Sequence, residues 1–168
     1  IVLSTGGSPN SFAGNVILST TPAGASPSAT IVTLLPNTTY YAFAAAINHG
    51  GAATAYTALG STSTLVAEPL TSVSTFANVA SSSFSVIWSA NGNPLSVTTY
   101  TVQLSTASDF NIYATSFTAS TVPAAGPGAT FTGLEGNPLY YFRVAALNHE
   151  GLSPSFVNLG STVPRPGS

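Results

Sequence analysis

The sequence predicts an all-β protein built from two similar units that follow one another along the chain. Residues 34–49 recur 100 positions later as residues 134–149, with no gap between the copies. Each copy contains a leucine, a turn with Asn and Pro, two adjacent tyrosines and then residues that alternate in size. This order is typical of a turn that leads into a central β-strand.

The first unit begins inside this repeated pattern. Residues 1–5 match residues 102–106, one position out of the register of the later segments. Glycine and proline residues then separate two further expected strands, one over residues 14–20 and one over residues 29–34. The last strand of the unit contains residues 59–62, whose sequence returns at the corresponding place in the second unit.

The second unit begins with segments that have no counterpart in the first. A strand is expected over residues 71–79 and another over residues 83–89. In the latter, Phe84, Val86 and Trp88 alternate with three serines and Ile87 and so form one apolar face. We therefore place the boundary near Ala67. This divides the chain into an incomplete domain over residues 1–66 and a complete domain over residues 67–168.

The charge of the chain excludes several kinds of partner. Charged residues make up 4% of the chain, against about 25% in typical proteins. The only cationic side chains are Arg143 and Arg165, so no nucleic-acid partner is expected, because phosphate binding needs clustered Lys and Arg. No apolar run approaches the ~20 residues that a membrane span requires. The formal net charge of −2 gives little repulsion between copies and favours association.

Few side chains in this chain can carry out chemistry. There is no Cys or Lys for covalent catalysis. His49 and His149 take the same place in the two units, but they lack the three or four ligands of a zinc site, so we expect ordinary loop imidazoles. The four acids are widely separated in the sequence: Glu68, Asp109, Glu135 and Glu150. The sequence predicts no catalytic residue, no metal site and no cofactor.

Several of these features together resemble the fibronectin type III family. Trp88 lies where that family keeps a tryptophan in its second strand. Leu134, followed six residues later by Tyr140, is similar to the family's leucine and tyrosine-corner pair, and Leu34 with Tyr40 repeats it in the first unit. The resemblance implies two tandem immunoglobulin-like, Greek-key antiparallel β-sandwiches. It also implies tyrosine hydroxyls bonded to backbone at the corners.

The resemblance further implies that the first copy contains only the third to seventh strands of the domain. Two complete units of 100 residues would need 200 positions, 32 more than the chain has. One explanation is that these residues were cleaved, disordered or left out, since termini are often trimmed. The other is that a strand from another copy completes the open sandwich, whose edges invite pairing.

Outward aromatic side chains are the candidate contacts with a partner. If the first tyrosine of each pair points inward, Tyr41 and Tyr141 point outward. Phe43 stands at the outward position that Arg143 takes in the second unit, while the small Ala42 replaces a phenylalanine at an inward position. We expect Tyr41, Phe43 and Tyr141 to contact another subunit or a sugar.

We interpret the chain as a non-enzymatic structural repeat module of a secreted or cell-surface protein of the bacterial, extracellular repeat type. Its modules would build a filament, fibre or stalk through module–module and subunit–subunit contacts, with copies of itself or neighbouring repeats as partners. The alternative is a spacer or accessory carbohydrate-binding module of a larger secreted enzyme that acts on polysaccharides. An adhesin repeat would share the same architecture.

Overall fold

The computed structural model describes residues 1–8, 16–21, 24, 28–95, 97–111, 116–121, 127–149, 151 and 155–165. Over these residues the chain forms eleven β-strands and no helix, and all strand pairs are antiparallel. The all-β prediction is confirmed. No helix in the described ranges is long and apolar enough to cross a membrane. The chain divides into two compact units, Ile1–Leu65 and Val66–Ser168, one residue before the predicted boundary.

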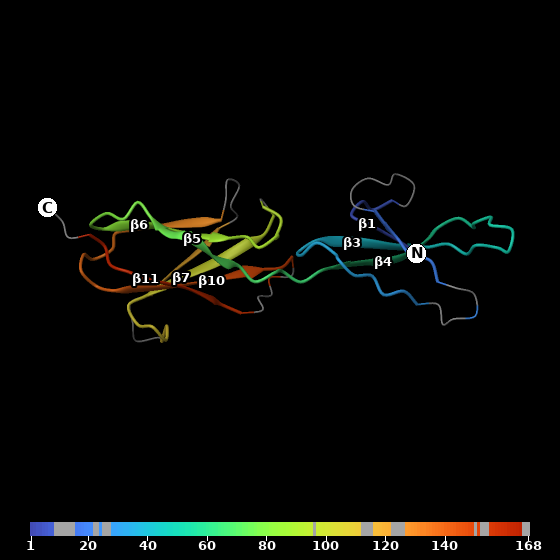
Figure 1. Ribbon diagram of the computed structural model, residues 1–168. Helices are drawn as coiled ribbons and strands as arrows, with labels where there is room; N and C mark the ends of the chain where they lie inside the picture. Colours follow the sequence, from blue (N-terminus) through green and yellow to red (C-terminus); the bar gives the residue numbers. More distant parts are fainter. Residues whose placement is uncertain are drawn as a thin grey trace. The chain divides into compact units, whose positions relative to one another are not determined.

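The second unit is a β-sandwich of two sheets (Figure 1). One sheet has three strands, in the order β5 (Leu70–Ala77), β6 (Ser83–Ser89) and β9 (Gly128–Thr132). The other sheet has four strands, in the order β11 (Val157–Thr162), β10 (Tyr140–Leu147), β7 (Thr99–Ser105) and β8 (Ser116–Thr121).

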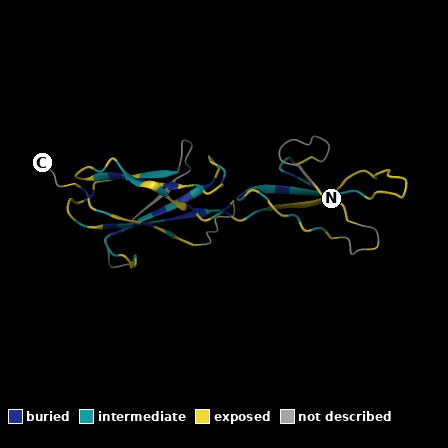
Figure 2. Cartoon of the chain, viewed as in Figure 1, coloured by how far each residue is buried: buried dark blue, intermediate teal, exposed yellow. Residues whose placement is uncertain are grey.

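The core of the second unit comes from the period-two pattern of its strands. Alternate residues of β6, β7 and β10 are buried and line the space between the sheets, as the dark blue stretches in Figure 2 show. Phe142 is at the centre, because its ring lies 5.3 Å from that of Phe76, 5.0 Å from Phe84 and 5.9 Å from Phe131. These tilted and edge-on geometries are the favourable ones for aromatic pairs.

The described part of the first unit contains a single four-stranded sheet. Its order is β2 (Val16–Leu18), β1 (Val2–Ser4), β3 (Thr39–Ala44) and β4 (Thr57–Ser63). This order corresponds to β8, β7, β10 and β11 of the second unit. The bulges correspond too, since the register shifts between Ala42 and Phe43 in one pair and between Phe142 and Arg143 in the other.

The prediction of a strand over residues 29–34 is wrong, because this described segment contains no strand. Its counterpart in the second unit is β9, which pairs with β6 along its whole length. No described residue of the first unit forms a strand equivalent to β6. The backbone groups of residues 29–34 therefore lack the strand to which they would hydrogen-bond, and sequence pattern alone does not supply one.

Candidate interaction surfaces

The two tyrosine corners fix the turns that precede the central strands. Tyr140 is buried at 2% exposure; its hydroxyl accepts a hydrogen bond from the Glu135 amide at 3.2 Å and lies 3.4 Å from the Glu135 carbonyl. The Tyr40 hydroxyl accepts a hydrogen bond from the Leu35 amide at 3.0 Å. These are the backbone bonds that the family resemblance implies. Both tyrosines are held inside their own units, so neither is available to a partner.

The other predicted structural residues also lie inside. Trp88 and Leu134 are buried in the core of the second unit, and Leu34 is half-buried in the first. The Trp88 ring packs against Tyr100, with the ring centroids 5.4 Å apart. Burial raises the pKa of Tyr100 above its ordinary value of 10.0, while the Asn93 side chain acts in the opposite direction.

Phe43 stands at the predicted outward position, but the expectation that its side chain is accessible to a partner is wrong. Its side chain is 4% exposed, and it lies directly across from Val2, which is buried as well. The two residues share the face of the sheet opposite to Tyr40. Burying a large aromatic side chain removes much apolar area from water, and the first unit does so on the face that carries Arg143 in the second unit. Phe43 is therefore a core residue of the first unit.

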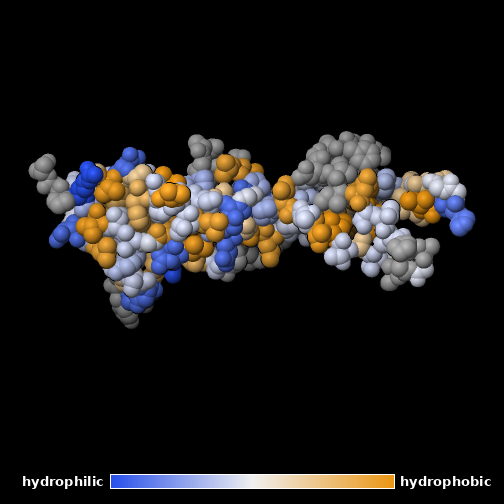
Figure 3. All heavy atoms as spheres, in the orientation of Figure 1, coloured by the Kyte–Doolittle hydropathy of each residue, from blue (hydrophilic) through white to orange (hydrophobic). Residues whose placement is uncertain are grey.

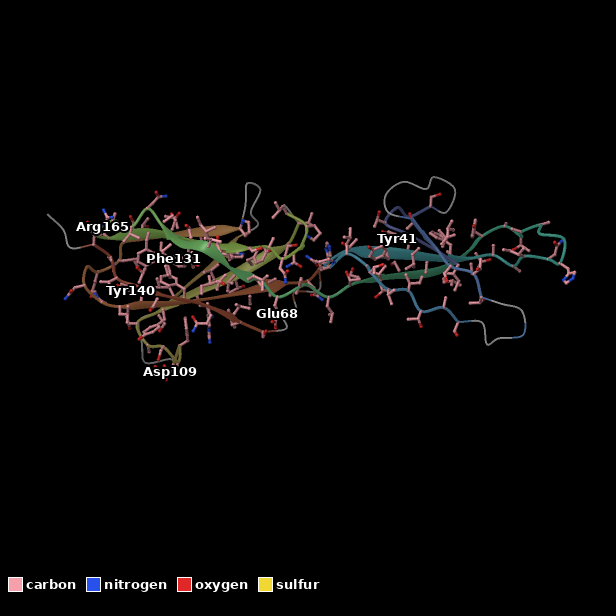
Figure 4. All side chains as sticks on the ribbon, viewed as in Figure 1. Tyr41, Glu68, Asp109, Phe131, Tyr140 and Arg165 are labelled. Carbon is pink, nitrogen blue, oxygen red and sulfur yellow. The ribbon has the colours of Figure 1, made fainter. Side chains whose placement is uncertain are left out.

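The two other predicted contact residues, Tyr41 and Tyr141, are half-buried. Tyr41, labelled in Figure 4, lies beside the glycine turn after β1, where a Cβ on Gly7 would sit 3.8 Å from the tyrosine ring. Tyr141 lies across from Ser105 on the neighbouring strand. Part of each residue is accessible to solvent. Their contact with a partner stays a prediction.

A stacked arginine on the outer face of β10 was missed by sequence reasoning. The Arg143 Cζ atom lies 4.2 Å from the ring centroid of Phe110 and 4.4 Å from that of Phe156. Its Nε donates a hydrogen bond to Gln103 Oε1 at 2.7 Å, across the strand pair that joins β7 and β10. Cation–π contacts of this kind contribute about 0.5–1 kcal/mol each when exposed. Arg143 therefore ties two loops to the sheet.

The signal for this cluster in the sequence is weak. Arg143 is one of two arginines and stands at an outward strand position. Phe110 and Phe156 lie outside the strands, one in the loop after β7 and one just before β11. Periodicity does not indicate where such loop residues fold, so no pattern brings the three together.

The remaining ionisable groups are dispersed. Asp109 accepts hydrogen bonds from the side chain and the backbone of Asn111, which lower the pKa of its carboxyl group. Glu68 accepts a hydrogen bond from the Ser155 hydroxyl, while Glu150 lies outside the described residues. Glu68 and Asp109 are both labelled in Figure 4.

Neither histidine has a metal site around it in the described ranges. His49 and His149 are both exposed. No group of three or more His, Cys, Asp or Glu side chains that could hold a metal ion occurs within those ranges. The Asn that precedes each histidine closes the local turn through its backbone, since the carbonyls of Asn48 and Asn148 accept hydrogen bonds from the amides of Gly51 and Gly151 at 3.0 and 2.9 Å. The Asn48 side chain also accepts a hydrogen bond from the Ala52 amide at 2.9 Å.

Comparison with known families agrees with the sandwich of the second unit. A family model for the fibronectin type III domain matches residues 69–157. The chain belongs to the fibronectin type III family. Fibronectin type III domains are generally non-catalytic modules and are typical of extracellular proteins. The cluster of Arg143, Phe110 and Phe156 therefore lies on the outer face of the four-stranded sheet of a fibronectin type III domain.

The solved structures that are similar to the chain include the following two. One, described as a myokine structure, is 19% identical with a TM-score of 0.41, and the match covers 58% of this chain and 96% of that one. The other contains the FN1–FN3 domains of chicken CNTN1, is 19% identical with a TM-score of 0.42, and is matched over 79% of this chain and 45% of its own length. No curated protein sequence matches the chain.

Proposed function

We propose that this chain is a non-enzymatic structural repeat module of a secreted or cell-surface protein. Its modules build an extracellular filament, fibre or stalk through contacts between neighbouring modules and between subunits. The observation that carries the proposal is the repeat itself. The sheet of the first unit has the strand order and the bulge of the four-stranded sheet in the fibronectin type III domain, which supports a tandem array of such domains.

The polar chemistry of the chain supports a structural role over a catalytic one. Ionisable side chains are rare, and those with described partners bind local backbone or neighbouring side chains. Catalysis needs several functional groups that converge on a reacting atom. A nearly neutral surface also allows copies to approach one another without strong repulsion. On the face shown in Figure 3, hydrophobic residues form several separate patches on both units.

The proposal is tested by the assembly state of purified protein. Chains that carry several tandem repeats of residues 1–168 are concentrated and examined by sedimentation velocity and negative-stain electron microscopy. We expect large species whose amount grows with concentration, together with fibres of uniform width. Protein that remains monomeric at high concentration, with no fibres in the micrographs, contradicts a filament-building role.

The alternative is an accessory carbohydrate-binding module, and the half-exposed Tyr41 and Tyr141 favour it, because they occupy the same outward position in both units. A tyrosine presents an apolar ring together with a polar hydroxyl, which suits a ligand such as a sugar that has both apolar and polar groups. Sedimentation of the chain with insoluble polysaccharides tests this role, with a Tyr141→Ala variant as the control. Binding that depends on Tyr141 supports the alternative.

A further inference from the structure

The turn that follows β6 contains the only Asn-Gly pair of the chain, Asn91 and Gly92. Both residues are exposed, and both have positive φ angles, 51° and 81°. The amide of Asn93 donates a hydrogen bond to the carbonyl of Ala90 at 3.1 Å, which closes the turn around them. Two central residues with positive φ are the mark of a type I′ turn, the conformation that Asn-Gly pairs favour. The second unit therefore presents this pair to solvent.

The same turn holds the first residues of the second unit. The Asn91 Nδ2 atom donates a hydrogen bond to the carbonyl oxygen of Glu68 at 2.9 Å. The Asn93 side chain binds Ala67 twice, because its Oδ1 accepts from the Ala67 amide at 2.9 Å and its Nδ2 donates to the Ala67 carbonyl at 2.8 Å. Of these three bonds, only the one to Glu68, which is labelled in Figure 4, depends on Asn91.

Asn91 and Gly92 carry the two groups of an intramolecular reaction. The backbone nitrogen that follows an asparagine can attack the Cγ atom of its side chain. The Gly92 amide has no hydrogen-bond partner among the described residues, and it is exposed to solvent. Gly92 also has no side chain that would obstruct a close approach of its backbone. Nothing in the described part of the turn therefore protects Asn91 from this attack.

We propose that Asn91 is a site of spontaneous deamidation in the folded protein. The Gly92 nitrogen loses its proton to solvent hydroxide and forms a bond to Asn91 Cγ. The bond from Cγ to Nδ2 breaks, and the amide group takes up a proton from solvent and leaves as ammonia. Water then opens the resulting succinimide ring at either carbonyl, which yields an aspartate or an isoaspartate. The net reaction consumes one water and releases one ammonia, and it is independent of the proposed function.

The other asparagines with positive φ in the described ranges lack this combination. Asn37 is 1% exposed, and Asn137 precedes a proline, whose nitrogen carries no hydrogen. Asn78 is exposed and has a φ of 52°, almost the same as Asn91. Its next residue is Val79, whose branched side chain crowds the backbone nitrogen. Asn78 is thus a comparison within the same chain that differs from Asn91 in the residue that follows.

Deamidation removes the hydrogen bond to Glu68. The donor Nδ2 is lost, and a carboxylate oxygen takes its place beside the Glu68 carbonyl, where neither atom can donate to the other. An isoaspartate also adds one carbon to the main chain of the turn. The formal net charge of −2 becomes more negative by one unit, a large relative change for a chain with four acidic and two basic side chains. Ion-exchange chromatography should therefore separate the product from the original chain.

Ageing of the purified chain tests the proposal. The protein is kept folded for several weeks at mildly alkaline pH, where a backbone amide loses its proton more readily. Chymotrypsin then cuts after Trp88 and Leu95 and releases residues 89–95 for mass spectrometry. We expect the mass gain of an amide-to-acid change at Asn91 to exceed that at Asn78 by at least about tenfold, because glycine leaves the attacking nitrogen accessible and valine does not. Asn91→Gln is the matched control, since its longer side chain would have to form a larger ring.

Three results overturn the proposal. One is a gain at Asn91 no greater than that at Asn78, and another is an equal gain in the Asn91→Gln variant. The third is a gain that appears only when the chain is aged in urea, because the folded turn then protects Asn91.

Thermal unfolding followed by Trp88 fluorescence tests the consequence for the fold. Asn91→Asp reproduces one product and should lower the midpoint by roughly 4 °C, the order expected for the loss of one hydrogen bond. Asn78→Asp places the same charge at an exposed asparagine of the same unit and should leave the midpoint nearly unchanged. Equal shifts in the two variants would show that charge, and not the bond to Glu68, is responsible. That outcome overturns the anchoring role of Asn91.

Discussion

Phe142→Ala is the substitution for which the structure makes the sharpest stability prediction. Phe142 is fully buried and contacts three aromatic rings in the sandwich core, from β5, β6 and β9. It lies on β10, which is hydrogen-bonded on both sides to β7 and β11. With both neighbouring strands in place, the backbone has little freedom to collapse into the space that the ring leaves.

The expected loss follows from this geometry. Phe→Ala changes in cores typically cost about 3–5 kcal/mol, and the cost is higher where the cavity cannot close. We therefore expect the free energy of unfolding of the second unit to fall by about 4 kcal/mol. That is a large share of the ~5–15 kcal/mol of an ordinary domain.

Urea unfolding followed by tryptophan fluorescence measures this loss. Trp88 is the only tryptophan of the chain and lies in the core of the second unit, so its emission reports on that unit alone. With an m-value of about 2 kcal/mol/M, the midpoint should fall by about 2 M. Val73→Ala, at an exposed position, is the control and should change stability by less than about 0.5 kcal/mol. A loss below about 1 kcal/mol for Phe142→Ala would refute the central packing role of Phe142.

Three further predictions concern the second unit. Tyr140→Phe removes the corner hydroxyl and should cost about 1–2 kcal/mol in the same urea titration, because a backbone amide loses its partner; an unchanged midpoint would show that the corner bond is dispensable. Arg143→Ala should lower the free energy of unfolding by about 1–3 kcal/mol and speed proteolysis of the two loops that hold Phe110 and Phe156. Arg143→Lys should restore only part of this loss, since an ammonium group cannot stack as a planar guanidinium does. Equal behaviour of the two variants would contradict a stacking role. Burial raises the pKa of Tyr100, so above pH 10.0 the unfolded chain loses this proton while the folded chain keeps it. Stability contributed by Tyr100 is therefore present below pH 10.0 and falls as pH rises further. Tyr100→Phe should flatten this fall in thermal unfolding measured between pH 9 and pH 11, and an identical pH profile would count against it.

The two units use one position in different ways. At the outward position of the central strand, the second unit has Arg143 stacked between two phenylalanines, and the first unit has the buried Phe43. In both units the outer face of the sheet is therefore partly covered. In the second unit this cover is added to a complete sandwich core, whereas the described residues of the first unit form a single sheet.

Local pattern was enough to predict much of the fold. Residues 83–89 form β6 with the predicted bounds, because the alternation of apolar and polar residues is a property of the segment itself. The tyrosine corners were implied by the family resemblance, and they too are local, since each hydroxyl bonds a backbone group only five residues away. The registers of the two four-stranded sheets match as well, and the structure alone supplied them.

Only the tertiary structure decided the features that depend on distant partners. Residues 29–34 form no strand because a strand needs a neighbour to hydrogen-bond, and the described first unit provides none there. Phe43 is buried, and burial depends on what covers its face of the sheet. Period-two alternation places neighbouring residues on opposite faces, but it does not determine which of the two faces is covered. Arg143 meets Phe110 across 33 positions of sequence because two loops fold over one strand. Alternation and turn chemistry act over a few residues, whereas cover, pairing and stacking are set by segments that meet only when the chain has folded.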